Sequence, residues 1–329
     1  MTGGYDEERL HQQFDRPRRR TRPRTKDRPR HADAEDAWVV GIDRGRYTLL
    51  VGDDDRRVTA MKSRPLGRKG VVVGDRVRVV GDTSGRPDTL ARIVDVEERS
   101  TVLRRTADDD ETHERVVVAN ADQLVVVTAL ADPPPRPRLV DRCLVAAYDA
   151  GMTPLVCLTK ADLADPAPLA EQLAPLHVDV VVTERGGDLA MLRERLRGRT
   201  SVLVGHSGVG KSTLVNALVP DAELTTGHVN EVTGRGRHTS TAARVLALPF
   251  GGWIVDTPGI RSFGLAHVSA DGLLAAFGDL KEVAVDCPRG CQHTASDPEC
   301  ALDAAVADGR VDAARVDSFR RLLASREGE

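Results

Sequence analysis

The sequence predicts a protein of three folded domains: an N-terminal β-barrel, a central α/β domain and a small C-terminal helical domain. Short apolar runs broken by Gly and Asp fill the first third of the chain, and continuous Val/Leu runs alternate with helical stretches after them. Three cysteines and a histidine cluster near the C-terminus. With 329 residues, 40% of them hydrophobic, the chain can bury the cores of two or three domains.

Residues 1–35 are expected to form an unfolded, arginine-rich arm. Residues 16–30 carry nine Arg or Lys against one Asp, with three prolines and no apolar residue, although the formal net charge of the chain is only −3. The arginine guanidinium can donate two hydrogen bonds to phosphate oxygens, so such an arm could bind the phosphate backbone of a nucleic acid. The alternative, which the sequence favours equally, is that the arm is a solvated tail without a specific partner.

The chain has no apolar run of about 18 residues and no apolar stretch after its basic start. We therefore expect no membrane span, no signal peptide and a cytoplasmic location. Cysteines of a cytoplasmic chain do not suggest disulfides. Cys143 and Cys157 fall in a helix-like and a strand-like apolar segment, so we expect both in the core.

Residues 36–105 predict a five-stranded barrel of the OB-fold type, a fold that binds RNA. An SH3-like barrel would give nearly the same pattern. A linker is expected over 106–118, and its acidic run 108–111 suits a solvated linker or a hairpin tip. The expected strands are Trp38–Val40, Tyr47–Val51, Val71–Val73, Val77–Val80 and Ala91–Val94.

Residues 119–265 predict a three-layer α/β domain, because continuous Val/Leu runs are typical of parallel strands buried on both faces. Helices are expected at 139–150, 188–196 and 211–218. The expected strands are Leu124–Val127, Leu155–Leu158, Val178–Val182, Val202–Val204 and Trp253–Val255.

A phosphate-binding loop follows the strand that ends at Val204. The segment Gly205–Ser212 reads GHSGVGKS, which matches GxxxxGK(S/T) and precedes an expected helix. Backbone N–H groups would wrap the phosphates, Lys211 would reach the β- and γ-phosphates, and Ser212 would hold Mg²⁺. The nucleotide-binding residues expected here are Gly205, His206, Ser207, Gly208, Val209, Gly210, Lys211, Ser212 and Thr213.

A base-reading motif, Thr159-Lys160-Ala161-Asp162, also ends an apolar strand, at the sheet edge where ligands bind in such folds. Asp162 can accept hydrogen bonds from guanine N1–H and the 2-amino group, and adenine offers neither donor. Lys160 would lie over the base, and Thr159 replaces the more usual Asn. Thr183, after the next strand, is a candidate for the remaining base-side contact.

The third motif, Asp256-Thr257-Pro258-Gly259, follows the phosphate loop. Asp256 would bind Mg²⁺, through water, and the Gly259 N–H would contact the γ-phosphate. In an ordinary GTPase the base-reading motif lies downstream of the phosphate loop, whereas here it lies upstream. The order base, phosphate, switch predicts a P-loop GTPase domain with circularly permuted motifs.

The segment Gly234–Thr241 has the composition of a switch loop that Mg²⁺ and the γ-phosphate would order, although a plain surface loop is the alternative. Thr239 is the first candidate for the Mg²⁺ contact and Thr241 the second. Ile260 occupies the position of the water-orienting Gln of Ras-like enzymes, so we expect slow hydrolysis without help. His238 is the candidate helper, or an exposed loop histidine without a role.

The cysteine cluster lies in the expected C-terminal domain, residues 266–329, with helices at 271–277, 301–306 and 311–323. Three thiolates and one imidazole within fourteen residues predict a structural, tetrahedral Zn²⁺ site, and unliganded core cysteines are the alternative. The expected ligands are Cys287, Cys291, His293 and Cys300.

Residues 37–323 resemble the RsgA family of circularly permuted GTPases. The resemblance rests on the barrel, Asn120–Gln123 (NADQ), TKAD, GHSGVGKS, GRGRHTST, DTPGIRSFGL and the Cys-Cys-His-Cys cluster. It implies an OB-fold, a permuted GTPase domain, a zinc domain, and binding to the small (30S) ribosomal subunit and its rRNA in late maturation, with GTP hydrolysis stimulated by that subunit. The cluster departs from the family spacing: it is one residue shorter between the first two cysteines and one longer after the histidine. The arginine-rich arm lies outside the resemblance.

The leading hypothesis is therefore a monomeric GTP hydrolase that uses GTP/GDP, Mg²⁺ and one structural Zn²⁺. A second hypothesis is an RNA-binding assembly scaffold with a nearly inert nucleotide site. GTP turnover that is stimulated by the subunit would distinguish the enzyme from such a scaffold. A third, a P-loop ATPase or small-molecule kinase, is disfavoured by Asp162 and by the lack of an evident acceptor pocket. The sequence leaves open which rRNA elements are contacted and which residue activates water.

Overall fold

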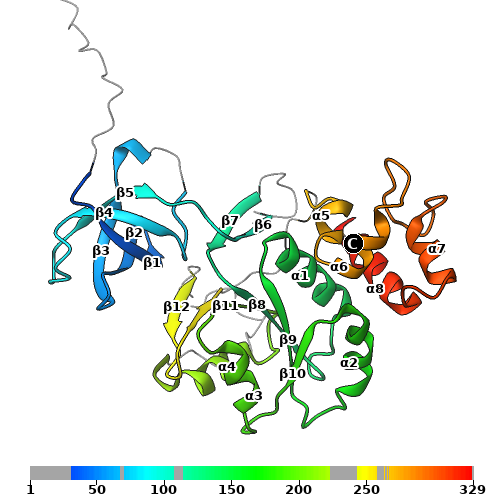
Figure 1. Ribbon diagram of the computed structural model, residues 1–329. Coiled ribbons are helices and arrows are strands. Elements are labelled where there is room, and N and C mark those ends of the chain that lie inside the picture. Colours follow the sequence, from blue (N-terminus) through cyan, green and yellow to red (C-terminus); the bar gives the residue numbers. More distant parts are fainter. Residues whose placement is uncertain are drawn as a thin grey trace, which may run out of the picture. The chain divides into compact units, whose positions relative to one another are not determined.

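The structure of the chain is a computed structural model that describes residues 31–66, 70–106, 114–222, 243–257, 263, 265 and 267–327 (Figure 1). Residues 1–30, and with them nearly all of the expected arginine-rich arm, lie outside the described residues. Residues Asp33–Glu329 form one compact unit. No described helix combines the length and the apolar character needed to cross a membrane.

The N-terminal domain is a closed five-stranded barrel. Its strands are β1 (Glu35–Asp43), β2 (Arg46–Val51), β3 (Arg56–Lys62), β4 (Arg76–Gly81) and β5 (Ala91–Val96). Their order is β1-β2-β3-β5-β4, the pairing of β1 with β4 closes the barrel, and β3 runs parallel to β5. The short 3-10 helix η2 (Arg64–Leu66) follows β3. This connectivity confirms the OB-fold prediction.

The strand predictions for the barrel omitted one strand and placed another wrongly. Strand β3, RRVTAMK, was missed because its apolar residues are few, yet they alternate: Val58 and Ala60 are buried between exposed neighbours. The apolar run Val71–Val73 forms no strand, only an isolated bridge between Val73 and Val118. The buried Asp75 accepts a hydrogen bond from the Val72 N–H at 2.8 Å, which holds this segment as a turn.

A two-stranded antiparallel sheet, β6 (Val102–Thr106) with β7 (Glu114–Ala119), connects the barrel to the central domain. Residues 114–118 of the expected linker belong to strand β7, whose inner residue Val118 is fully buried. The acidic run 108–111 lies outside the described residues.

The central domain has the predicted parallel sheet. Its strands lie in the order β10-β9-β8-β11-β13, followed by β12, which runs antiparallel to β13. Strand β12 was not predicted; it also pairs with barrel strand β1 through Gly41 and Arg244. The bounds are β8 (Gln123–Ala129), β9 (Thr153–Thr159), β10 (Asp179–Val182), β11 (Thr200–Val204), β12 (Arg244–Ala247) and β13 (Trp253–Asp256).

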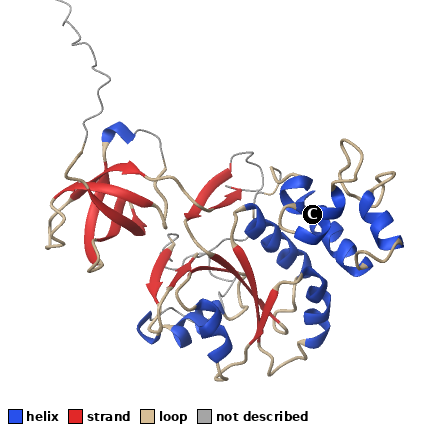
Figure 2. Ribbon diagram, viewed as in Figure 1, coloured by secondary structure: helices blue, strands red, loops and turns tan. Residues whose placement is uncertain are grey.

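Helices cover both faces of this sheet (Figure 2). One buried cluster joins the sheet to α1 (Pro137–Asp149) and α2 (Ala167–Leu173), and another joins it to α3 (Ala190–Leu196) and α4 (Lys211–Leu218). The three-layer prediction is confirmed, although α2 was missed. Burial raises the pKa of Cys143 to about 12 and that of Cys157 to about 11, so both are protonated core thiols, as expected.

The C-terminal domain is helical, as predicted. Its helices are α5 (Ala270–Leu274), α6 (Gly278–Ala284), α7 (Ala301–Ala307) and α8 (Ala313–Ala324). The single helix expected over 271–277 ends early, at Leu274, and α6 was missed. Phe277 packs edge-on against Tyr148 of α1, with ring centroids 5.5 Å apart, and against Phe319 of α8 at 5.2 Å. This aromatic row attaches the C-terminal domain to the central one.

Candidate nucleotide site and metal centre

The phosphate-binding loop connects the end of β11 to the start of α4. A Cβ atom on Gly205 would lie 2.2 Å from the Val127 carbonyl oxygen, so only glycine fits there. Gly208 and Gly210 adopt φ angles of +83° and +93°, which side chains disfavour. Ser212 and Thr213 lie in the first turn of α4. The loop therefore has the backbone shape that turns N–H groups toward a phosphate at a helix N-terminus.

Lys211 and Asp256 place opposite charges at the carboxyl edge of the sheet. The Lys211 ammonium donates to the carbonyls of Gly205 and His206, the latter at 3.1 Å. Burial lowers the pKa of Lys211, and Asp256 partly opposes this. Burial raises the pKa of Asp256, against the effects of Lys211 and Arg244. A bound triphosphate with Mg²⁺ would give each of these half-buried charges a partner.

Thr159 joins the base-reading motif to the phosphate loop. Its side chain is buried, and its hydroxyl donates to the Val209 carbonyl at 2.7 Å. Lys160 follows with a left-handed φ of +63°, and its ammonium donates to the Asp132 carbonyl. The carboxylate of Asp162 is exposed and has no hydrogen bond or ion pair with a described residue. The base-reading motif, which precedes the phosphate loop in the sequence, thus lies next to that loop in space. A circularly permuted GTPase needs this arrangement to form one nucleotide site.

Thr183 fixes the backbone of the same motif. Its N–H donates to the Leu158 carbonyl at 2.7 Å, and its own carbonyl accepts from the Ala161 N–H at 3.2 Å. Its buried hydroxyl lies 3.3 Å from the Leu158 oxygen. The side chain therefore already has a partner inside the protein, and its contact with the base stays a prediction.

One wall of the site was not found from the sequence: the segment from Asp132 to Arg136. Pro133 Cδ lies 3.4 Å from the place where a Cβ on Gly208 would be, so this segment lies against the phosphate loop. The run of three prolines after the β8 strand was the available signal, because it marks a rigid connection where a helix could not yet begin.

His206 lies within a cationic environment. Burial lowers its pKa, and Arg136, Lys211 and Lys160 lower it further. Its Nδ1 lies 2.8 Å from the Ser207 oxygen, whereas its buried Nε2 has no hydrogen-bond partner among the described residues. The imidazole is thus neutral near pH 7, and the surrounding positive charges would attract an anionic ligand.

The residues expected to act in hydrolysis lie outside the described part of the chain. These are His238, Thr239, Thr241, Gly259 and Ile260, together with the rest of the segment Gly234–Thr241. Their roles stay predictions. Thr257, next to Asp256, is described: its buried hydroxyl donates to the Leu203 carbonyl at 3.0 Å and so fixes the end of β13 against β11.

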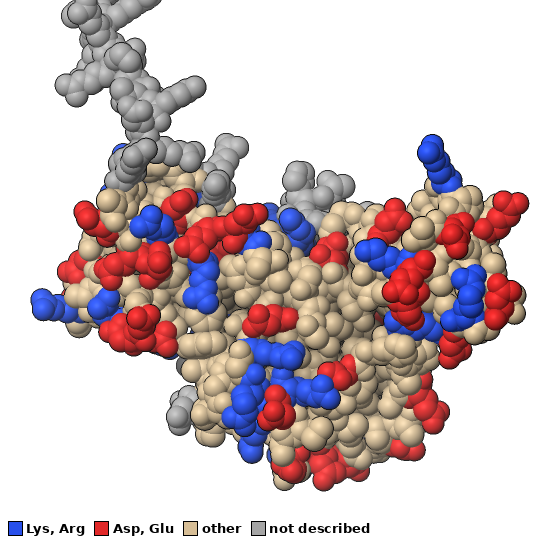
Figure 3. All heavy atoms as spheres, viewed as in Figure 1, with Lys and Arg blue, Asp and Glu red and all other residues tan. Residues whose placement is uncertain are grey.

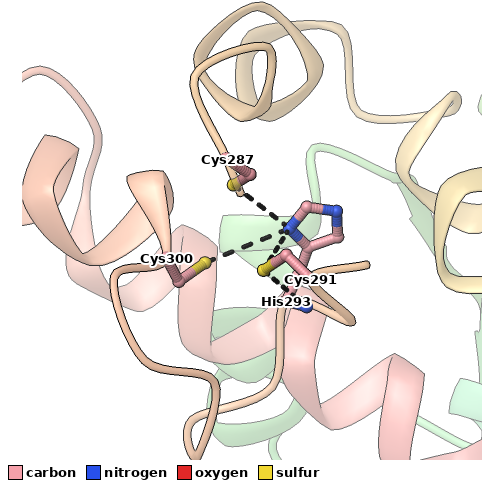
Figure 4. Close-up of side chains that lie close together, drawn as sticks. All are labelled: Cys287, Cys291, His293 and Cys300. Carbon is pink, nitrogen blue, oxygen red and sulfur yellow. Dashed lines mark hydrogen bonds between the residues drawn. The ribbon is translucent and has the colours of Figure 1, made fainter. Parts of the chain in front are cut away.

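The four expected zinc ligands converge (Figure 4). Their ligand atoms all lie within 4.8 Å of one another. The Nδ1 atom of His293 is 3.5 Å from the sulfurs of Cys287 and Cys291 and 4.0 Å from that of Cys300. Zinc bonds of about 2.3 Å to sulfur and about 2.0 Å to nitrogen imply a tetrahedral S–N edge of about 3.5 Å. The donor set therefore fits Zn²⁺, and the altered spacing does not prevent convergence.

Backbone groups and an arginine hold these ligands in place. The N–H of Ala301 points at the Cys287 sulfur, 3.3 Å away, and the His293 N–H lies 3.4 Å from the Cys291 sulfur. Arg320 donates from Nε to the His293 carbonyl at 3.0 Å and binds Asp303 through two further nitrogens. Such contacts orient ligands around a metal.

Comparison with known proteins gives a consistent result. The family model described as RsgA GTPase matches residues 96–266. A Chlorobaculum parvum protein named small ribosomal subunit biogenesis GTPase RsgA is 39% identical over 301 residues, covering 87% of this chain and 96% of the relative. A Pseudomonas fluorescens protein of the same name is 40% identical over 264 residues, covering 78% of this chain and 75% of the relative.

Two solved structures share the fold. YjeQ from Thermotoga maritima superposes with a TM-score of 0.67 at 26% identity, covering 90% of this chain and 99% of that one. YloQ, described as a circularly permuted GTPase, gives a TM-score of 0.65 at 24% identity, covering 92% of this chain and 98% of its own.

Proposed function

Because this chain belongs to the RsgA family of GTPases, we propose that it hydrolyses GTP to GDP and phosphate in the late maturation of the small ribosomal subunit. The relatives carry that subunit in their names. One observation supports the nucleotide assignment above the others: the Thr159 hydroxyl binds the Val209 carbonyl, so the base-reading motif and the phosphate loop form one site. The proposed partner is the small subunit with its rRNA, and the protein acts as a monomer in the cytoplasm.

In this proposal the main contribution of the chain is to hold the base and the phosphates of GTP in fixed positions. Asp162 accepts from the guanine edge, Lys160 lies over the base, and the loop amides with Lys211 hold the phosphates. Ser212, Asp256 and Thr239 would hold Mg²⁺, directly or through water, and the ion would supply positive charge next to the phosphate oxygens.

Hydrolysis is slow until the subunit assists. Ile260 stands where Ras-like enzymes carry a water-orienting Gln, and an alkyl side chain cannot orient water. His238, in the switch segment, is the proposed helper. GTP hydrolysis would then be fast only when the small ribosomal subunit is bound.

The zinc domain is proposed to sense the state of the switch through α1. Arg142 of α1 donates to the Phe263 carbonyl at 2.9 Å, just after the third motif, and to the Ser325 carbonyl at 2.8 Å, at the end of α8. His267 also contacts Asp149 of α1 at 2.7 Å. A shift of the third motif on loss of the γ-phosphate would thus act on both ends of the zinc domain and release the subunit.

Co-sedimentation with small subunits tests this coupling. The protein loaded with a non-hydrolysable GTP analogue should pellet with the subunits, and the GDP-loaded protein should remain largely in the supernatant. Equal retention of the two forms would contradict the coupling. Replacing Arg142→Met should reduce the difference between the two forms, whereas Arg138→Met, an exposed arginine of the same helix, should not.

A further inference from the structure

Arg136 is an exposed arginine beside the phosphate loop, and none of the three nucleotide motifs includes it. It stands immediately before α1, whose first residue is Pro137. Its carbonyl accepts hydrogen bonds from the N–H groups of Leu139 and Val140, at 3.0 Å and 3.1 Å. The first turn of α1 therefore fixes the backbone of Arg136.

The segment that leads to Arg136 is also held at its other end. Pro133 Cδ lies 3.4 Å from the position that a Cβ atom on Gly208 would take, so the segment lies against the phosphate loop. The Lys160 ammonium donates to the Asp132 carbonyl one residue earlier. Because both ends of this short segment are fixed, the side chain of Arg136 starts from a defined position next to the loop.

The charge of Arg136 lies near the part of the loop that would receive a γ-phosphate. Lys211, which reaches the β- and γ-phosphates in loops of this type, has its ammonium 3.1 Å from the His206 carbonyl. Burial lowers the pKa of His206, and nearby positive charges lower it further. Arg136 is the strongest of those charges, ahead of Lys211 and Lys160. The guanidinium and the Lys211 ammonium are therefore close to the same end of the loop.

The side chain of Arg136 forms neither an ion pair nor a hydrogen bond with any residue that the structure describes. Over the barrel and the zinc domain, by contrast, Lys and Arg side chains are interspersed with Asp and Glu (Figure 3). In the zinc domain Arg320 pairs with Asp303 at 2.8 Å. In the barrel Arg56 pairs with Glu35 at 3.1 Å. The donors of Arg136 thus remain available to a ligand.

The positive groups around the loop outnumber the carboxylates that act on them. Asp256 opposes the effect of burial on the pKa of Lys211. The Lys160 ammonium contacts only a neutral carbonyl, and no described carboxylate pairs with Arg136. Positive charges brought together repel one another, and an anion between them removes that repulsion. A nucleoside triphosphate brings one phosphate more than a diphosphate, and its terminal group would enter this region.

We propose that Arg136 binds the γ-phosphate of GTP and so makes this chain distinguish GTP from GDP. The planar guanidinium donates two parallel hydrogen bonds to oxygens of that phosphate. The inference rests on the proposed function, which makes GTP the nucleotide. The phosphate backbone of RNA is a less suitable partner, because Arg136 lies beside the loop that holds the phosphates of the nucleotide.

Equilibrium titration of the full-length protein with fluorescent GDP and a fluorescent non-hydrolysable GTP analogue tests the proposal. Arg136→Met should weaken binding of the GTP analogue about tenfold and binding of GDP less than about twofold, because GDP lacks the phosphate that Arg136 binds. Arg136→Lys should weaken binding of the analogue only about threefold, since lysine keeps the charge but not the paired donors.

Arg138→Met is the matched control. Arg138 is an exposed arginine of the same helix, and it is not among the charges that lower the pKa of His206. Its replacement should change both affinities by less than about twofold.

Urea unfolding of the same variants separates binding from folding. Arg136→Met should leave the unfolding midpoint of the nucleotide-free protein unchanged, because the side chain forms no hydrogen bond or ion pair with a described residue. A lowered midpoint together with an equal loss of affinity for both nucleotides would mean that Arg136 acts on the fold, and it would overturn the proposal.

The proposal is also overturned if Arg136→Met weakens neither nucleotide, or weakens both equally. In that case the proposed function still stands if small subunits stimulate GTP turnover of the unaltered protein. Selective loss of affinity for the GTP analogue, with no effect of subunits on turnover of the unaltered protein, would support the role of Arg136 and contradict the proposed function. Normal nucleotide binding with loss of co-sedimentation would place Arg136 at the subunit and overturn the proposal.

Discussion

Asp162 stands at the carboxyl end of β9 with an exposed carboxylate that no described residue engages. The N1–H and the 2-amino group of guanine would both donate to this carboxylate. In an Asp162→Asn variant an amide NH₂ replaces one of the two oxygens, so one guanine donor would face another donor. Asp162→Asn should therefore weaken GTP binding about 100-fold or more and shift the preference to xanthosine triphosphate. Equilibrium titration with fluorescent nucleotides measures this.

The matched control is Asp165→Asn. Asp165 is an exposed carboxylate three positions further along, whose oxygen accepts from the Ala167 N–H at 3.0 Å. This variant should keep its preference for GTP. Unchanged GTP preference in the Asp162 variant would remove the base-reading assignment.

For single residues, the sequence predicts motif positions better than individual contacts. The phosphate-loop motif Gly205–Ser212 and the cluster of expected zinc ligands could be read from residue type and spacing, because glycine and cysteine requirements are local. The hydrogen bond from Thr159 to Val209, and the approach of Pro133 to Gly208, join residues far apart in the chain. Such contacts depend on how β8, β9 and β11 pair, which no local pattern encodes.

Among the connecting elements, the turn before β4 is tightly packed. Gly74 has a φ of +92°, and a Cβ there would lie 1.9 Å from the Ala119 carbonyl oxygen. Trp38 Nε1 and Asn120 Nδ2 both donate to the Gly74 carbonyl, at 3.1 Å and 3.0 Å. Gly74→Ala should thus separate the barrel from β7 and destabilise the fold by about 3 kcal/mol.

Urea unfolding followed by tryptophan fluorescence reports on this junction, because Trp38 and Trp253, the only two tryptophans, pack edge-on with centroids 5.0 Å apart. Gly45→Ala is the control: Gly45 has a φ of +79°, but no described atom lies within 4 Å of the position that a Cβ would take. The substitution should destabilise the fold by only about 1 kcal/mol. Similar midpoints for the two variants would argue against a steric role of Gly74.

The zinc cluster offers a second test among the elements. Cys300→Ser removes one thiolate, and the remaining three ligands should hold zinc much more weakly, so metal analysis should fall from one zinc per chain to well below one. Gln292→Ala, an exposed neighbour, should retain the metal. Zinc absent from the unaltered protein, or fully retained by the Ser variant, would contradict the assignment.

Elements themselves were predictable where apolar residues are dense. The five parallel strands were found, whereas β3, α2 and β12 were missed because their apolar runs are short and their stability comes from neighbours. Strand β12 pairs with β13 on one side and β1 on the other, and β1 is distant in sequence.

Across the whole molecule, the central domain contacts both the barrel and the zinc domain. The pair Gly41–Arg244 continues the sheet into the barrel, and the row Tyr148, Phe277 and Phe319 joins α1 to the zinc domain. A change at the nucleotide can therefore reach both flanking domains through packed contacts.

Arg315 of α8 is one such contact, and its ion pair leads to a pH-dependent prediction. It binds Asp279 through two nitrogens at 3.0 Å and the Pro175 carbonyl at 2.8 Å. Hydrogen bonding to Arg315 lowers the pKa of Asp279. A lowered folded pKa stabilises the protein above the unfolded pKa of about 3.9, and that stabilisation is lost as pH falls through the folded value.

Asp279→Asn should therefore lower the urea midpoint at pH 7, and its deficit relative to the unaltered protein should shrink as pH falls below about 4. Asp317→Asn, an exposed carboxylate of α8 with no ion pair to a described residue, should show no such trend. A deficit that stays constant with pH would mean that Asp279 acts by packing and not by charge.

The rate of phosphate release from GTP and from ATP, with and without purified small ribosomal subunits, decides whether the chain is a GTPase that responds to the subunit. We expect slow GTP hydrolysis by the protein alone, stimulation of at least about tenfold by the subunits, and no comparable ATP hydrolysis. GTP turnover that the subunits leave unchanged, or equal turnover of the two nucleotides, would contradict the proposed function.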